Sequence, residues 1–153
     1  MSDLERVDFK ITLSAEWYRL PCHVKIWLDD ELIEDTEISE RNSSGEKRVI
    51  EFGRELPDGE HAIKVQYLDK TNLDTVIDEQ RNILKDHLLN IDEIEIDEIE
   101  LGFMAFKEGV FYPDREIRPD LPETIREMVC IGFNGTWELK FQVPTYIWFL
   151  ENL

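Results

Sequence analysis

The chain has 153 residues, of which 42% are hydrophobic, so it is long and apolar enough to fold around one core and lacks the composition of a disordered chain. Its formal net charge of −18 repels phosphate backbones and anionic lipid surfaces, which argues against nucleic-acid and membrane partners. The sequence shows no secretion signal and no apolar run of about 20 residues, the length of a membrane span. We therefore expect a single domain over residues 1–153 that is not exported.

Five short apolar runs in the first half of the chain predict β-strands. Most of them alternate apolar and polar residues, which is the pattern of a strand with one buried face. The runs cover residues 7–13, 22–28, 32–38, 49–52 and 61–67.

Polar segments with turn residues separate these runs. In Leu56-Pro57-Asp58-Gly59 the proline presets φ and the glycine accepts a positive φ, so we expect a tight turn. Asp29-Asp30-Glu31 predicts another turn, and residues 39–47 have the composition of a loop. Residues 69–78 form a polar connection that is rich in side-chain oxygens.

The acidic stretch of residues 85–101 combines strand-forming Ile and Leu with many carboxylates. Its apolar residues fall at positions 89, 91, 94, 96, 99 and 101, so their parity changes twice and a regular strand would not keep them on one face. A β-bulge near Asp92-Glu93 restores the register after the first change. A turn at Asp97-Glu98 accounts for the second change.

The last third of the chain predicts further strands around one long loop. Residues 103–111 are apolar with two glycines and suggest a hairpin, whereas the three prolines within residues 112–124 predict an irregular loop. Residues 128–133 and 137–143 have strand patterns. Asn134-Gly135 between them is a strong signal for a two-residue hairpin turn.

Many short strands with turn residues between them, and no alternation of strands with long helices, predict an all-β fold. We expect a jelly-roll-like antiparallel β-sandwich. Pro144 is tolerated at a first helical position, so residues 145–153 should form a short C-terminal tail that is either helical or extended.

Two segments of the chain resemble known β-sandwich proteins. Residues 59–67 (Gly-x-His-x-Ile-x-Val-x-Tyr) and 86–97 (Asp-x-x-Leu-x-Ile-Asp-x-Ile-x-Ile-Asp) are similar, in this order, to motifs of calcium-dependent xylan-binding carbohydrate-binding modules. The same pair, together with residues 70–75, 132–137 and 144–153, resembles small uncharacterised β-sandwich proteins of tailed phages that infect cyanobacteria. These resemblances imply a jelly-roll sandwich in a virion or in a glycan-binding context.

Six oxygen-bearing side chains in and after the polar connection predict a calcium site. Calcium takes six to eight hard oxygen ligands, and carboxylates supply most of them in proteins. The alternative is a solvated acidic loop, because the chain has 35 acidic residues and the spacing is not that of an EF-hand. The predicted ligands are Asp69, Asn72, Asp74, Asp78, Asp86 and Asp92.

Aromatic side chains outside the expected core are candidates for glycan binding, because sugar rings stack on exposed aromatic faces. Trp27 lies on the polar side of its predicted strand, and Trp17, Tyr18 and Tyr112 lie in predicted loops. The alternative for Trp27 is that another segment covers it. Trp137 shares a face with apolar residues and is expected in the core.

The C-terminal segment has a dense aromatic cluster with two interpretations. Tyr146, Trp148, Phe149 and Leu150 either fold back to cap the sandwich or dock into a neighbouring subunit of a homo-oligomer. Loss of folding on deletion of residues 144–153 would favour the cap.

Signals for catalysis are sparse. Ser44-x-x-Lys47 lacks companion motifs, the three histidines are scattered, and Cys22 and Cys130 are expected to be two buried thiols. We therefore expect a non-enzymatic structural or accessory protein of a tailed-phage virion, located in the virion or the host cytoplasm, that recognises other virion proteins or a glycan. The alternatives are a free-standing calcium-dependent carbohydrate-binding module and, third, a small hydrolase with two carboxylates at catalytic separation.

Overall fold

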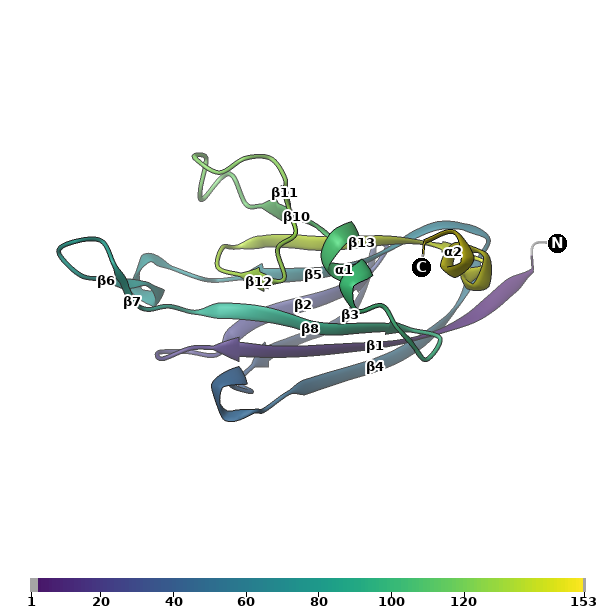
Figure 1. Cartoon of the computed structure of the whole chain (residues 1–153), viewed down its shortest axis with the longest axis horizontal. Coiled ribbons are helices and arrows are strands. Elements are labelled where there is room, and N and C mark those ends of the chain that lie inside the picture. Colours follow the sequence, from purple (N-terminus) through teal and green to yellow (C-terminus); the bar gives the residue numbers. More distant parts are fainter. Residues whose placement is uncertain (1–2, 153) are drawn as a thin grey trace.

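Antiparallel strands dominate the fold, which confirms the prediction of an all-β sandwich. The structure is a computed structural model that describes residues 3–152, with 55% of the chain in strands and 13% in helices. Two sheets pack face to face, and a short helix follows at the C-terminus (Figure 1).

The first sheet contains the acidic stretch at its centre. Its strand order is β12-β8-β1-β4, with β9 paired to β8. The strands are β1 (Leu4–Glu16), β4 (Arg48–Pro57), β8 (Leu88–Ile96), β9 (Ile99–Glu100) and β12 (Cys130–Ile131).

The second sheet has six strands in the order β11-β10-β13-β5-β2-β3. All its neighbouring pairs are antiparallel. The strands are β2 (Cys22–Leu28), β3 (Glu31–Ile38), β5 (Gly59–Leu68), β10 (Val110–Pro113), β11 (Ile125–Arg126) and β13 (Gly135–Val143).

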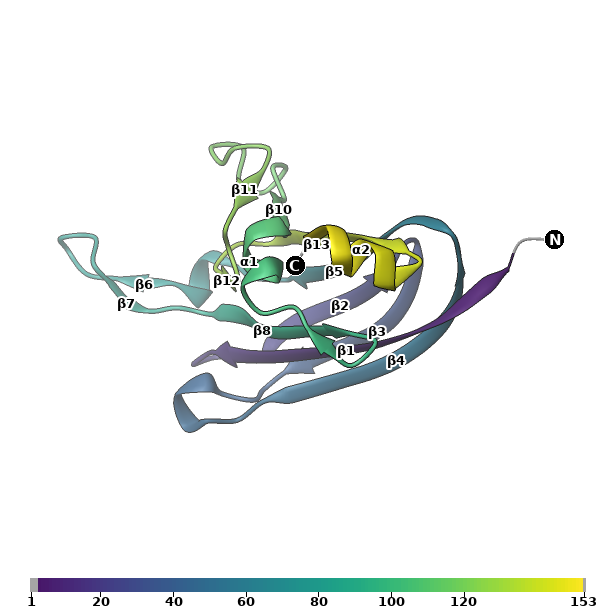
Figure 2. The same ribbon diagram turned by 45° about the vertical axis from the view of Figure 1, so that its right-hand side comes forward.

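A separate two-stranded hairpin, β6 (Val76–Ile77) and β7 (Ile83–Lys85), projects from one end of the sandwich (Figures 1 and 2). The helical elements are short. They are the 3₁₀ turns η1 (Asn42–Ser44) and η2 (Asn72–Asp74) and the α-helices α1 (Phe103–Glu108) and α2 (Thr145–Asn152).

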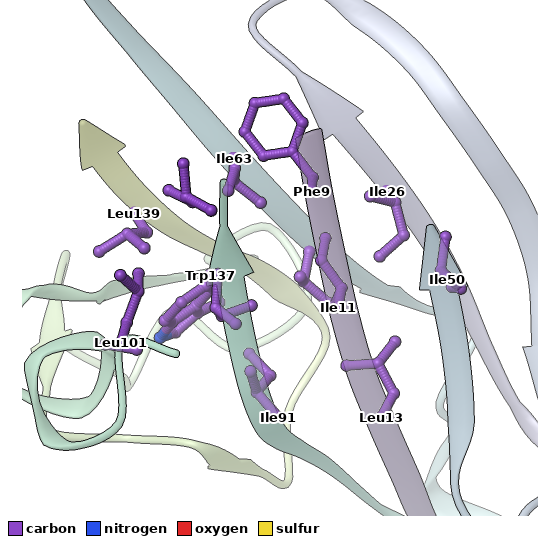
Figure 3. Packing of buried hydrophobic residues seen from close by; sticks show 14 of the residues in the cluster. Phe9, Ile11, Leu13, Ile26, Ile50, Ile63, Ile91, Leu101, Trp137 and Leu139 are labelled. Carbon is purple, nitrogen blue, oxygen red and sulfur yellow. The ribbon is translucent and has the colours of Figure 1, made fainter. Parts of the chain in front are cut away.

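Inward-facing residues of both sheets form one hydrophobic core. Phe9, Ile11 and Leu13 of β1 point toward Ile63 of β5 and Trp137 of β13 (Figure 3). Period-two alternation places these side chains on the inner faces, where each is almost fully buried. Burial of apolar surface from two facing sheets is the main force that holds the layers together.

The acidic stretch accommodates its two changes of parity with a β-bulge and a turn, both at the positions predicted from the sequence. Thr12 pairs with Glu93 and Leu13 pairs with Ile91, which leaves Asp92 as the extra residue of a β-bulge. The turn at Asp97-Glu98 has φ values of 52° and 66° and lets Ile96 pair with Ile99. Leu89, Ile91, Ile94 and Ile96 therefore all reach the core, whereas Leu88 at the start of β8 is only half-buried. The solvated side keeps its carboxylates.

The predicted hairpin at Asn134-Gly135 is wrong. Cys130–Ile131 pairs with β8 in the first sheet, whereas Gly135–Val143 pairs with β5 and β10 in the second. The Asn134 side chain is buried, and it accepts a hydrogen bond from Lys70 N at 2.9 Å and donates one to Lys70 O at 2.8 Å. This long-range clamp holds the chain where it crosses between sheets.

The predicted hairpin over residues 103–111 is also wrong, because α1 occupies most of it. Helix α1 buries Met104 and Ala105 and gives way to β10 after Gly109. A Cβ on Gly109 would lie 2.3 Å from Cζ2 of Trp137, so the glycine permits close packing on the indole ring. The glycine therefore marks a tertiary contact and not a hairpin turn.

The two cysteines differ in environment. Cys22 is buried as predicted, but Cys130 is exposed, which corrects the expectation of two buried thiols. Cys130 lies on β12, a two-residue edge strand that leaves its outward side chain uncovered. The C-terminal tail is helical over residues 145–152, and Leu153 lies outside the described residues.

Candidate functional site

An open cleft of about 560 Å³ lies beside the projecting β6–β7 hairpin, between it and the connection of residues 114–134. Its surface is mainly apolar, and Ile77, Ile83 and Ile117 are each more than half exposed. Apolar side chains gathered in an open cleft make it a candidate interaction site. The apolar lining consists of Ile77, Ile83, Leu88, Ile117, Met128 and Phe133.

The floor of the cleft is a nearly buried ion pair. Lys70 Nζ lies 2.6 Å from Asp86 Oδ1, and the two side chains are only 9% and 15% exposed. Lys70 also donates to Gly132 O at 2.5 Å, while Thr75 Oγ1 donates to Asp86 at 2.7 Å. Because Asn134 fixes the Lys70 backbone, the floor ties the root of the hairpin to the 114–134 connection.

A second buried polar group lies behind this floor. Asp74 accepts hydrogen bonds from Thr71 N at 2.8 Å and Arg19 Nε at 3.0 Å, and it lies 3.2 Å from His87 Nδ1. Burial opposes ionisation of Asp74, but these donors outweigh it and lower its pKa. Burial lowers the pKa of His87, so the ring is neutral and donates to Asp74. The arrangement stabilises the base of the hairpin.

The buried thiol next to this group is chemically quiet. Cys22 Sγ lies 3.4 Å from Tyr67 Oη, and burial raises the pKa of Cys22 to about 11. Burial also raises the pKa of Tyr67. A thiol that stays protonated is a poor nucleophile, so the pair acts as core packing with a satisfied hydroxyl.

Three of the predicted calcium ligands are already engaged by basic side chains. Asp86 pairs with Lys70, and Asp74 pairs with Arg19. Asp69 lies 2.5 Å from His23 Nδ1. Each of these three carboxylates therefore has its own basic partner: Lys70 for Asp86, Arg19 for Asp74 and His23 for Asp69.

The other three predicted ligands are dispersed. Asp78 accepts hydrogen bonds from Asn82 at the tip of the β6–β7 hairpin, Asp92 lies 3.1 Å from Lys47, and Asn72 is exposed in η2. Within residues 3–152, no group of three or more His, Cys, Asp or Glu is arranged to hold a metal ion. The structure thus does not gather the six side chains, and calcium binding stays a prediction.

Two of the predicted glycan-binding aromatics, Trp17 and Tyr18, already contact neighbouring side chains and backbone carbonyls of the protein. The Arg41 guanidinium lies 3.9 Å above the Trp17 ring, whose Nε1 donates to Ser39 O. Tyr18 donates its hydroxyl hydrogen to Leu73 O, and Lys85 Nζ lies 5.4 Å from its ring. A sugar would have to displace these contacts to stack on either ring.

The other two aromatics lie in the second sheet on different strands. Trp27 is half-buried, between the exposed and covered alternatives, and its Nε1 donates to Gln66 Oε1 at 3.1 Å. Tyr112 on β10 is 40% exposed. Tyr112 is therefore the predicted aromatic whose ring is most open to a ligand.

Part of the C-terminal cluster is buried, as a cap requires, and part of it is exposed, as a docking surface requires. Trp148 and Phe149 are buried, and Trp148 makes an edge contact with Phe141 of β13. Tyr146 is 63% exposed and Leu150 82% exposed. One face of α2 therefore caps the core, and the other face presents apolar side chains to solvent.

Sequence reasoning missed the cleft itself. Its signal is present as aliphatic residues in segments whose composition predicts polar or proline-rich loops, such as Ile77 and Ile117. Asn134 was assigned to a turn, although its role is to clamp Lys70. Only the pairing of distant segments brings these residues together.

Comparisons with models of protein families, with curated proteins and with solved structures found no match. Within residues 3–152, no helix has the length and apolar character to span a membrane.

Proposed function

We propose that this protein is a non-enzymatic structural or accessory subunit of a tailed-phage virion that acts through contacts with other proteins. The observation that carries the proposal is the exposed aliphatic surface of the β6–β7 hairpin and the cleft beside it. When a second protein covers exposed aliphatic side chains, apolar surface is removed from water and the free energy of the complex is lowered. The resemblance of residues 59–67 and 86–97 to small phage proteins supplies the virion context.

Aliphatic side chains favour protein over glycan as the main ligand. Sugars are recognised by open aromatic faces flanked by polar groups, whereas the cleft is lined mainly by Ile, Leu and Met. Its one aromatic ring, Phe133, has the Arg118 guanidinium 5.2 Å from its centroid. Most of the cleft's charged and amide groups are already paired within the protein: Lys70 with Asp86, Arg118 with Asp120, and Asn134 with the Lys70 backbone. Few polar groups therefore remain in the floor for sugar hydroxyls.

The test is mass spectrometry of purified particles of the phage that encodes the chain. We expect its peptides at a fixed stoichiometry relative to known structural subunits, retained after a high-salt wash. Absence from washed particles, with abundant protein in the lysate, would refute a structural role.

Calcium-dependent glycan recognition is the second candidate, supported by the exposed ring of Tyr112. It predicts heat of binding and a higher melting temperature at millimolar calcium, because a ligand that binds only the native state stabilises it. Glycan-array binding should then be lost in Tyr112→Ala and kept in Tyr146→Ala, which removes a more exposed tyrosine elsewhere. No calcium effect and no glycan binding would eliminate this candidate.

A further inference from the structure

Both sheets of the sandwich end in an edge strand on the same side of the molecule. Strand β4 ends the first sheet and β3 ends the second. An ion pair between Arg54 of β4 and Glu31 of β3, at 2.9 Å, holds the two strands beside each other. A strand with a neighbour on one side only has unpaired backbone N–H and C=O groups along its other side. The free sides of β3 and β4 therefore form one open margin of the molecule, along which β4 runs in Figure 1.

Of these two strands, β4 presents the more regular backbone. It pairs with β1 without a break from Arg48 to Pro57. Strand β3 has an extra residue, Ile33, where its pairing with β2 shifts, and bulges of this kind protect edge strands from further pairing. The one proline of β4 is its last residue. Strand β4 is therefore the edge on which an added strand can form a continuous ladder of hydrogen bonds.

The side chains at the middle of β4 leave room for such a strand. The Gly53 carbonyl accepts a hydrogen bond from Arg54 Nη1 at 2.8 Å. The same guanidinium also bonds Glu31 through Nε and Nη2, so a backbone N–H can replace Nη1 at the carbonyl without releasing the arginine. Phe52 stacks on Phe9 with 4.8 Å between ring centroids and is half-buried. An added strand would cover the open side of Phe52.

Charge along the open margin selects a basic partner. Four exposed carboxylates of β3 and β4 form no ion pair among residues 3–152, and both arginines of β4 are held by other carboxylates. The basic residues opposite Glu51 and Glu55 on β1, Lys10 and Arg6, pair instead with other carboxylates of β8 and β1. The four free carboxylates are those of Glu34, Glu37, Glu51 and Glu55.

These carboxylates also determine which class of ligand fits. A second copy of this chain would bring the same four negative charges against them, and like charges that face each other on neighbouring strands are destabilising. Sugars and lipids lack the regular row of donors and acceptors that a strand backbone supplies. We propose that β4 accepts an extended segment of another protein, with Lys or Arg at alternate positions, as an added strand. This surface is not the cleft on which the proposed function rests, so either can fail alone.

The experiment uses a peptide of four Lys-Val repeats, acetylated and amidated, titrated into the full chain in about 0.15 M salt, where charges are screened beyond roughly 8 Å. Hydrogen exchange of individual backbone amides is followed by NMR. We expect alternate amides of β4 to become protected, because they donate to the added strand. Amides of the β6–β7 hairpin should exchange at an unchanged rate.

A second peptide separates ladder formation from general attraction to an acidic protein. It has the same sequence and charge, but every backbone nitrogen is methylated, so it has no N–H to donate to β4. It should not protect the β4 amides. This comparison uses the wild-type chain and does not depend on the folding of any variant.

Two double variants with the same change in net charge test the position of the contact. Glu51→Lys with Glu55→Lys places positive charges opposite the lysines of the peptide and should weaken binding by at least about tenfold. Glu79→Lys with Glu116→Lys changes exposed residues away from β4 and should bind as the wild type does. All four positions are exposed, so near-UV circular dichroism should remain native.

No protection of β4 amides at millimolar peptide would overturn the added strand. Equal protection by the methylated peptide, or equal affinity of the two double variants, would also overturn it, because binding would then depend on net charge alone. Presence in washed particles together with either result would refute this inference and leave the proposed function standing. A confirmed added strand with absence from particles would do the reverse.

Discussion

The three histidines differ in protonation because their hydrogen-bond partners differ. Nδ1 and Nε2 of His61 lie 2.7 Å from Asp29 Oδ2 and 2.8 Å from Pro57 O, and both partners only accept hydrogen bonds. His23 likewise contacts two carboxylates. His87 Nε2 accepts from Arg19 N at 3.0 Å, so that nitrogen has no proton. The contacts thus require an imidazolium at His61 and His23 and a neutral ring at His87.

We therefore predict that NMR titration gives midpoints above 6.5 for His23 and His61 and below 6.5 for His87. Asp69 is the main cause of the raised pKa of His23; at His61 burial opposes the charge, and Asp29 and Pro57 O outweigh it. Asp29→Asn should lower the His61 midpoint, whereas the fully exposed neighbour Asp30→Asn should not change it. A His87 midpoint above 6.5 would contradict the assignment.

These shifts determine opposite effects on stability. A raised pKa means that the folded state holds its proton more tightly, so His61 and His23 stabilise the fold below the unfolded pKa of about 6.5. That contribution is lost as pH rises through their folded pKa values. The lowered pKa of His87 has the reverse sign, and stability falls as pH drops from about 6.5 through its folded pKa.

At the scale of single elements, the turn between β8 and β9 is built from residues that do not favour it. Asp97 and Glu98 both have positive φ, a conformation that costs a non-glycine residue roughly 1 kcal/mol. Asp97 compensates through its side chain, which accepts from Asp8 N at 3.0 Å and Thr145 Oγ1 at 2.6 Å. Glu98 is exposed.

Glu98→Gly should accordingly raise the free energy of unfolding by about 0.5–1 kcal/mol, because glycine adopts positive φ without strain. The matched control is Glu100→Gly, which places glycine in strand β9 and should lower stability by a similar amount. Chemical denaturation measures both. Equal losses in the two variants would refute the argument from backbone strain.

Helix α2 provides a second element-scale prediction. Trp148 is 6% exposed and packs on Phe141, so Trp148→Ala should cost about 3–5 kcal/mol of unfolding free energy. Tyr146→Ala on the same helix should change stability by less than about 0.5 kcal/mol. Thermal and urea denaturation give the comparison, and a small effect at Trp148 would show that α2 does not cap the core.

At the scale of the whole molecule, 35 acidic residues against 17 basic ones place strong self-repulsion on the folded state. Ion pairs such as Lys10–Glu95 and Lys47–Asp92 relieve it locally on the first sheet. The remaining repulsion is long-range and is screened by salt. The fold is therefore less stable at low ionic strength than its core alone would allow.

The melting temperature should rise between roughly 0.02 and 0.5 M NaCl, because the Debye length shrinks over this range. KCl at equal ionic strength should give the same increase. CaCl₂ at equal ionic strength should raise the melting temperature more than NaCl or KCl only if calcium binds. A melting temperature that falls with added NaCl would mean that attractive ion pairs outweigh the net repulsion.

The sequence by itself determined the features that depend on near neighbours in the chain. Alternation fixed the faces of Cys22–Leu28 and Gly59–Leu68, and parity located the bulge at Asp92 and the turn at Asp97-Glu98. These predictions succeeded because side-chain direction in a strand depends on local backbone geometry alone.

Only the tertiary structure decided which distant segments meet. Asn134 joins Lys70 and does not close a hairpin, Gly109 lies against Trp137, and α2 buries one aromatic face while exposing the other. The cleft exists because two connections between strands lie side by side at one end of the sandwich. Pairing and burial depend on partners tens of residues away, and a local sequence pattern does not specify those partners.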